Sequence, residues 1–220
     1  MNQSSPLSMM QAMLLILTDQ QPRTDALFIH GVMKTELNDI ELKLGRNMLH
    51  GRLTKRLVLN KMTAAECKKH GIAYGGYEAW LDRLRSLSVE ESDILFIPPS
   101  VHTGTECDNL ITLALEQEWD SLTIMSQPEH LLRCMLQIVY VMEVRNVQLK
   151  VYALTPKIVN WGIPAVKMVM NGPTIAGNLF TQIAAEYQRV EKYKDRSGTG
   201  YMPHATLDEL IAYYHQRDNL

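Results

Sequence analysis

The stretch SLTIMSQPEHLLRCMLQIVYVMEV, residues 121–144, joins a strand pattern directly to a helix pattern. Its first part, 121–126, is a short apolar run, as in strands that are buried on both faces of a parallel sheet. Pro128 stands at the first helical position, where proline is favoured, with Ser126 or Gln127 as the cap, and a helical run follows over 128–144. Repeated along the chain, this unit predicts the fold.

The same alternation of strand and helix occurs on both sides of this stretch. Further strands are predicted over 25–31, 55–60, 92–100 and 146–156. Helices are predicted over 35–52, 63–71, 76–88 and 105–119, the first with the stripe Leu37, Ile40, Leu44 and Leu49. The sequence therefore predicts an α/β fold, a Rossmann-like doubly wound parallel sheet of about five strands with helices on both faces.

The remaining segments are predicted to be helical additions to one domain. Residues 1–23 contain an N-terminal helix that packs on the core, and 24–156 form the Rossmann-type domain. Residues 157–220 form a C-terminal helical extension, with helices near 174–194 and over 206–220. Thr206 is the predicted cap of the last helix, with Glu209 at the capping-box position.

Composition excludes several functional classes. The 220 residues carry a net charge of -2, so no basic excess predicts nucleic-acid binding. The apolar N-terminal stretch is too short to span a bilayer and lacks the basic start of a signal peptide. The three cysteines form no pair or run with metal-ligand spacing, so no metal site is predicted. We therefore expect a cytoplasmic protein without a membrane span.

Ligands of doubly wound sheets bind outside the carboxyl ends of the strands, which selects the candidate residues. The first strand ends at His30 and Gly31, and the second ends at Asn60. The turn after the first strand has one glycine and lacks the G-x-G-x-x-G of dinucleotide-binding proteins, and no P-loop motif occurs. Gly31 permits close approach of a ligand to the backbone, or it serves only a tight turn.

The loop after the third strand is rich in small polar residues. Thr103, Gly104 and Thr105 precede or open a helix, and Asn109 follows inside it. Free N–H groups at a helix N-terminus bind anions, so this loop is a candidate anion site, although one threonine acting as a simple cap is the alternative.

Two potential cations, His130 and Arg133, lie near the start of the helix after the fourth strand. Cations are unfavourable at a helix N-terminus, and an anionic ligand held there by Arg133 would offset that cost. We therefore predict a ligand site from Ser126, Gln127, Glu129 and Arg133, with His130 as the catalytic candidate. The alternative is that Arg133 pairs with Glu129 at i,i+4 and has no ligand.

These segments together resemble the DUF218 family, also called the YdcF-like or SanA/ElyC-type family. The resemblance covers about residues 24–155 and rests on Asp25 to Gly31, on HTGTECDNL (102–110), on LTIMSQPEHLLRCM (122–135) and on the order of elements. Asn60-Lys61-Met62 replaces the Ser-Gly-Gly with which the family usually ends its second strand. The resemblance implies a Rossmann-like fold that binds a small molecule, and the departure puts shared catalysis in doubt.

Two hypotheses of function follow. In the first, the protein binds a small anionic or nucleotide-like ligand (a nucleotide, S-adenosylmethionine or a phosphorylated metabolite), and a transferase or hydrolase with His130 as acid or base is one form of it. In the second, it is a non-catalytic regulatory or scaffold module that binds a protein partner through its C-terminal helices. A homo-oligomer is compatible with either.

Overall fold

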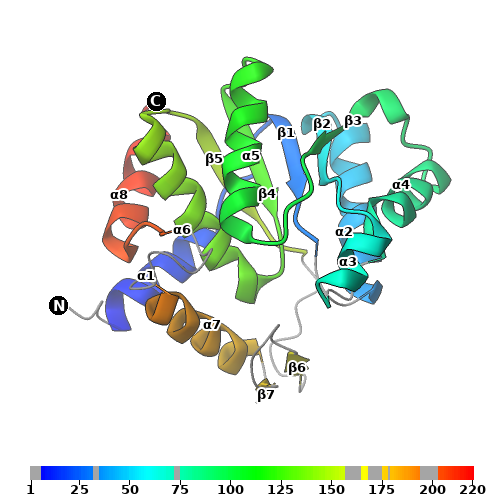
Figure 1. Ribbon diagram of the computed structural model, residues 1–220. Helices are drawn as coiled ribbons and strands as arrows, with labels where there is room; N and C mark the ends of the chain where they lie inside the picture. Colours follow the sequence, from blue (N-terminus) through cyan, green and yellow to red (C-terminus); the bar gives the residue numbers. More distant parts are fainter. Residues whose placement is uncertain are drawn as a thin grey trace.

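Five parallel strands form the central sheet in the order β3-β2-β1-β4-β5 (Figure 1). They are β1 (Thr24–Ile29), β2 (Thr54–Asn60), β3 (Ile94–Ile97), β4 (Ser121–Met125) and β5 (Lys150–Leu154). This computed structural model describes residues 6–31, 35–71, 75–156, 165–167, 175–177, 179–193 and 203–220. Each strand begins within a few residues of its predicted start, and the predicted α/β fold is confirmed.

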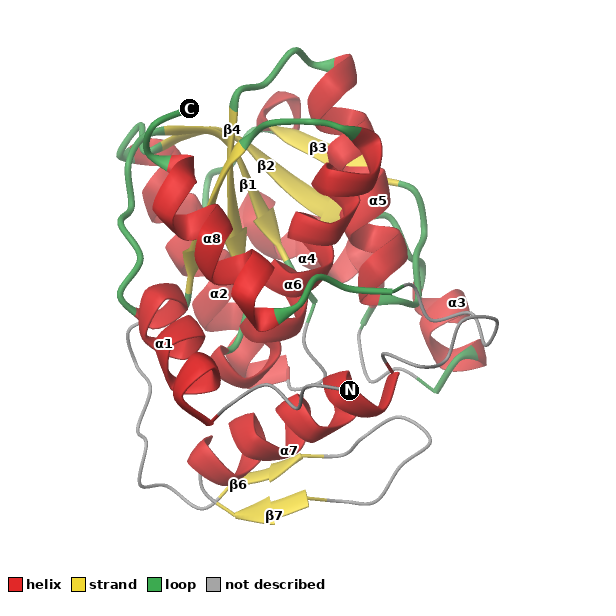
Figure 2. Ribbon diagram, turned by 90° about the vertical axis from the view of Figure 1, so that its left-hand side faces the viewer, coloured by secondary structure: helices red, strands yellow, loops and turns green. Residues whose placement is uncertain are grey.

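Helices cover both faces of the sheet, as predicted. In chain order they are α1 (Pro6–Leu17), α2 (Thr35–His50), α3 (Ala64–Lys69), α4 (Gly76–Ser86), the 3-10 turn η1 (Glu91–Asp93), α5 (Thr103–Glu116), α6 (Pro128–Arg145), α7 (Leu179–Tyr193) and α8 (Leu207–Arg217). Figure 2 shows α6 and α8 in front of the strands and α2 and α4 behind them. None of the described helices is both long and apolar enough to cross a bilayer.

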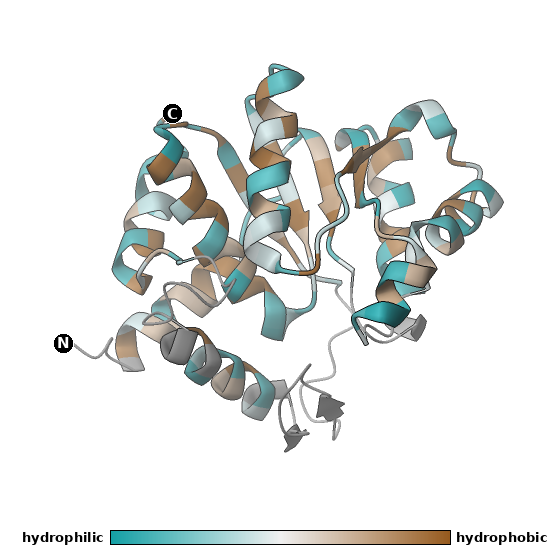
Figure 3. Ribbon diagram, in the orientation of Figure 1, coloured by the Kyte–Doolittle hydropathy of each residue, from teal (hydrophilic) through white to brown (hydrophobic). Residues whose placement is uncertain are grey.

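Two apolar cores lie on the two faces because alternate strand side chains point in opposite directions. On β1, Ala26 and Phe28 pack in the core under α5 and α6, whereas Leu27 and Ile29 pack in the core under α2 and α4. Both sets are at most 1% exposed, which explains why the strand has no polar alternation. In Figure 3 β3 is mainly brown, while α7 and α8 change between teal and brown as amphipathic helices do.

The structure corrects details of three predicted helices. The buried positions of α2 are Asn38, Glu41, Leu42, Gly45 and Met48, so they include two polar residues. Of the predicted stripe, Leu44 and Leu49 pack partly buried against the same core, Ile40 is half-buried, and the side chain of Leu37 lies outside the described residues. The helix predicted from about 174 begins at Leu179, because β6 (Ala165–Lys167) and β7 (Ile175–Gly177) form an antiparallel pair before it. The glycines and prolines of this segment are typical of loops, so the two strands of three residues were not predicted.

The helix caps agree with the prediction in part. α8 has the complete capping box of Thr206 and Glu209. Pro128 opens α6 after Gln127, whose side chain makes no cap bond. Neither Thr103 nor Thr105 caps α5, because the helix begins at Thr103 and His102 is the N-cap residue. The N-termini of α5 and α6 therefore differ from that of α8.

A buried ion pair ties the end of α1 to the end of α8. Arg217 donates to both carboxylate oxygens of Asp19 at 2.8 Å, and both side chains are 2% exposed. The guanidinium also lies over the rings of Tyr152 and Tyr214, 4.1 and 4.8 Å from their centroids. α1 and α8 are thus fixed beside β5.

Candidate functional site

The candidate site lies at the topological switch point of the sheet. Strand order reverses direction between β1 and β4, and ligands of open α/β sheets bind outside the carboxyl ends of the strands at such a point. His30 continues the ladder beyond β1, because its N–H donates to the carbonyl of Met125 at 2.9 Å. Ser126 is held likewise by the carbonyl of Leu154 at 3.1 Å. The residues that leave β1 and β4 therefore start side by side.

His30 is the central side chain of this site. It is 6% exposed, its Nε2 lies 2.6 Å from Glu106 Oε2, and its Nδ1 lies 3.2 Å from the carbonyl of Gly31. Burial alone would lower the pKa of His30, but the carboxylate of Glu106 and the thiol of Cys134 raise it well above its usual value. His30 and Glu106 therefore form a close buried pair.

His130 lies against His30 from the first turn of α6. The two Nε2 atoms are 3.3 Å apart, and the ring centroids are 4.4 Å apart in an edge-to-face arrangement. The Nε2 of His130 is also 3.4 Å from Thr103 Oγ1 on α5. The structure thus brings together His30, Thr103 and His130, which the sequence predicted from three separate segments.

Arg133 has an internal anion as its partner. Its Nε lies 3.0 Å from Glu186 Oε1 on α7, in a charge contact that is not an aligned hydrogen bond, and its Nη2 lies 2.7 Å from His130 Nδ1. Glu186 is 1% exposed and also lies 3.9 Å from His130 Nδ1. The carboxylate that offsets the charge of Arg133 at the start of α6 therefore comes from Glu186 on α7 and not, as the alternative prediction had it, from Glu129.

A second network fixes Glu106 from the β2 side. The amide of Asn60 donates to Glu106 Oε1 and to the carbonyl of Ser100, both at 2.7 Å, and its oxygen accepts from Ser100 N at 3.2 Å. The amide of Asn109 donates to Ser100 Oγ at 2.8 Å. Asn60 and Asn109 thus hold the loop before α5 and the orientation of Glu106.

The N-termini of α5 and α6 carry no side-chain cap among the described residues. His102 precedes α5 and Gln127 precedes α6, and neither side chain accepts from its helix. α3 and α8, by contrast, have complete capping boxes from Thr63 with Glu66 and from Thr206 with Glu209. The first N–H groups of α5 therefore receive no cap from His102, whereas α6 begins with Pro128, which has no N–H, and the amides of His130 and Leu131 donate to the carbonyl of Gln127.

The other predicted residues are distributed around this centre. Gly104 is buried and Thr105 half-buried in the first turn of α5, and Glu129 is buried in the first turn of α6. Ser126 is fully buried, and its hydroxyl has no hydrogen-bond partner. Gly31 contributes the carbonyl that faces His30.

Four site residues were missed by the sequence analysis: Glu41, Glu106, Cys134 and Glu186. Each lies within a helix and not at the carboxyl end of a strand. Glu41 is fully buried with neither carboxylate oxygen hydrogen-bonded, and burial raises its pKa well above the usual value. Glu41 could have been found as a carboxylate among the apolar positions of α2. No feature of the sequence near Glu186 indicates that it pairs with Arg133.

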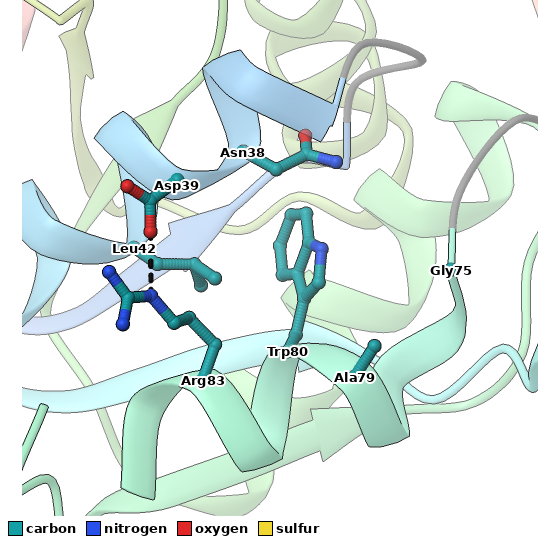
Figure 4. A pocket seen from close by; sticks show the side chains of 7 residues that line it. All are labelled: Asn38, Asp39, Leu42, Gly75, Ala79, Trp80 and Arg83. Carbon is teal, nitrogen blue, oxygen red and sulfur yellow. Dashed lines mark hydrogen bonds and ion pairs between the residues drawn. The ribbon is translucent and has the colours of Figure 1, made fainter. Parts of the chain in front are cut away.

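A separate pocket of about 180 Å³ lies between α2 and α4. Figure 4 shows Asn38 beside the ring of Trp80, with Asp39 and Arg83 paired at its edge at 2.6 Å. The buried Oδ1 of Asn38 has no hydrogen-bond partner. None of the predicted site residues is among the described residues that line this pocket.

Comparison with known proteins adds no identification. No family model matches the chain, and no curated protein matches it either.

Proposed function

We propose that this chain is a Rossmann-like protein related to the DUF218 family, which binds a small anionic or nucleotide-like ligand at the carboxyl ends of β1 and β4. One observation carries the proposal: α5 and α6 begin together at the switch point without a side-chain cap, as α4 does elsewhere, whereas α3 and α8 have complete capping boxes. Uncapped N–H groups and the helix dipole favour an anion at this position.

The ligand would contact the first turns of both helices. Backbone N–H groups of Thr103, Gly104 and Thr105 would bind an anionic group, and Thr103 Oγ1 lies 3.4 Å from His130 Nε2, which links the two helix starts. A nucleotide, S-adenosylmethionine or a phosphorylated metabolite has the required charge and size. In a transferase or hydrolase reaction, His130 would act as the acid or base.

Arg133 has a smaller part in this proposal than the sequence predicted. Its charge is already balanced by Glu186, so it would supply a net favourable contact only after that ion pair is rearranged. Thr103 and the N–H groups of α5 replace it as the main anion contacts.

The alternative of a partner-binding module gains no support from the described residues of the C-terminal helices. Ile183, Val190, Leu207, Leu210 and Tyr214 are all buried in the core that α7 and α8 share with α6. A cytoplasmic location is proposed because Cys67, Cys107 and Cys134 are all unpaired and buried.

A thermal-shift screen with inorganic phosphate, nucleotides, sugar phosphates and S-adenosylmethionine tests binding, because a ligand that binds only the native state raises the melting temperature. The decisive variant is His102→Asp, which places a strong capping carboxylate at the N-cap position of α5. We expect the variant without ligand to melt higher, by the equivalent of about 0.5–2 kcal/mol, and to bind the anion at least tenfold more weakly.

The matched control is Thr206→Asp, which adds the same charge at the N-cap of α8 and leaves α5 unchanged. It should bind the ligand as the native protein does. Equal binding by His102→Asp and the native protein would show that α5 does not hold the anion. A native protein that binds none of the four ligand classes would contradict the proposal as a whole.

A further inference from the structure

Three potential metal ligands meet at the switch point. His30, His130 and Cys134 each offer one ligand atom, and these atoms all lie within 4.8 Å of one another. His30 follows β1, whereas His130 and Cys134 are on neighbouring positions of one face of α6, at i and i+4. His30 and Cys134 are buried and His130 is partly buried, so the group is largely shielded from water.

The separation of the two imidazoles fits a shared ion. Nitrogen ligands of a tetrahedral zinc ion at about 2.0–2.1 Å lie about 3.3–3.4 Å from each other. His30 Nε2 and His130 Nε2 are 3.3 Å apart. The backbone bond from His30 N to Met125 and the start of α6 at Pro128 place the backbones of the two histidines side by side.

The two Nε2 atoms carry protons that a metal ion would replace. The Nη2 of Arg133 can only donate, so His130 Nδ1 accepts at 2.7 Å and the proton of neutral His130 is on Nε2. His30 Nε2 donates to Glu106 at 2.6 Å, so it carries a proton as well. A metal ion bound between the two nitrogens, which are 3.3 Å apart, would take the place of both of these protons.

We propose that His30, His130 and Cys134 form a binding site for a zinc-like divalent transition metal ion. Imidazole nitrogen and thiolate are the ligands that zinc prefers, and three protein ligands leave the fourth tetrahedral position open, as in catalytic zinc sites. Glu106 leaves His30 Nε2 when the ion binds and then lies beside that open position. Thr103 Oγ1, 3.4 Å from His130 Nε2, lies near the same place.

Metal binding exchanges the partner of His130. With the ion on Nε2, the proton moves to Nδ1, and a donor such as Arg133 is no longer a suitable neighbour. Glu186 Oε1, now 3.9 Å from Nδ1, is the acceptor within reach. A carboxylate behind a metal-bound histidine is a common second-shell arrangement, and here Glu186 and Arg133 have opposite effects on the affinity.

Cobalt(II) binding tests the site directly. Cobalt substitutes for zinc, and a cobalt–thiolate bond gives a charge-transfer absorption in the near ultraviolet. We expect one Co²⁺ per chain, this absorption in the native protein, and competition by Zn²⁺. Cys134→Ala should lose the absorption and weaken Co²⁺ binding by at least about 100-fold, since even second-shell changes cost 10–100-fold.

Cys107→Ala is the matched control, because Cys107 is equally buried between α5 and α6 but lies outside the group of three. It should retain the absorption and the affinity. His130→Asn provides a second ligand variant should Cys134→Ala fail to fold, and it should also bind Co²⁺ at least about 100-fold more weakly. Absorption that persists in Cys134→Ala, loss in Cys107→Ala, or no Co²⁺ bound by the native protein would each overturn the site.

Arg133→Gln separates this inference from the proposed function. The change removes the competing donor and a positive charge, so Co²⁺ affinity should rise by about tenfold. Anion binding is measured in parallel on protein kept in a chelator, where the metal site is empty by design. Unchanged or weaker Co²⁺ binding by Arg133→Gln would contradict the exchange at His130, whatever the anion result.

Discussion

Arg133 on α6 and Glu186 on α7 form an ion pair at 3.0 Å in which the carboxylate is 1% exposed. The pair joins the first turns of a central helix to a helix that follows the sheet in the chain. It also explains, without any bound ligand, how a positive side chain is tolerated at the start of α6.

Loss of Arg133 should therefore destabilise the protein. Arg133→Ala leaves Glu186 buried without its cation, which typically costs about 3–5 kcal/mol. Chemical unfolding in urea measures the change. Arg145→Ala is the control, because Arg145 and Asp108 form a more exposed pair at 30% and 36%, which should contribute less than about 1 kcal/mol. Equal losses for the two variants would contradict the structural role of Glu186.

The stability that the ion pair of Asp19 and Arg217 contributes should depend on the shape of the guanidinium as well as on its charge. Arg217→Lys keeps the charge but loses the two parallel bonds and the stacking on Tyr152. We expect Arg217→Ala to cost about 3–5 kcal/mol and Arg217→Lys to recover less than half of it. Calorimetry of both variants measures the loss of unfolding free energy. A lysine variant as stable as the native protein would show that charge alone accounts for the stabilisation.

Stability should fall in acid partly through Asp25. Burial alone would raise the pKa of Asp25, but bonds from Lys55, Ser121 and the amide of Asp120 lower it below its usual value. Because the folded pKa is lower than the unfolded value of about 3.9, this carboxylate stabilises the protein above that pH and the contribution is lost as pH falls through the folded pKa.

The test compares Asp25→Asn with the native protein in urea at neutral pH and near pH 3. The difference in unfolding free energy should be largest at neutral pH and shrink in acid. Asp208→Asn, at an exposed position of α8, provides the comparison for a general change of charge. A difference for Asp25→Asn that does not depend on pH would contradict this account.

Two glycines with positive φ should respond differently to alanine. Gly76 has φ 82°, and an added Cβ would lie 2.4 Å from the backbone nitrogen of Ala64. Gly71 has φ 66°, and nothing lies within 4 Å of such a Cβ. Gly71→Ala should cost only the backbone strain, about 1–2 kcal/mol, while Gly76→Ala should cost clearly more because α3 and α4 must move apart. Equal melting temperatures for the two variants would contradict this difference.

The strands could be predicted because each is buried on both faces and therefore reads as a continuous apolar run. Their order could not, since the sequence does not state that β4 pairs with β1 and not with β3. β6 and β7 were missed because a strand of three residues provides no periodicity to detect.

The site was predicted where its residues end a strand or open the helix that follows it. His30, Asn60 and His130 were found in this way, and the structure brings their networks together at Glu106. Cys134 and Glu186 lie on helix positions that also suit packing, so their roles depend on contacts between α6, α7 and β1 that only the folded chain defines.

The central position of β1 also sets the order in which the sheet can assemble. β2 follows β1 after a single helix, so these strands can pair early, but β4 is separated from β1 by α2, β2, α3, α4, β3 and α5. Until β4 arrives, one full edge of β1 and the side chains of Ala26 and Phe28 lack their native cover. Such late, non-local pairing slows folding and exposes an edge on which two unfolded chains can associate, so dilution and low temperature should increase the yield of folded protein on refolding.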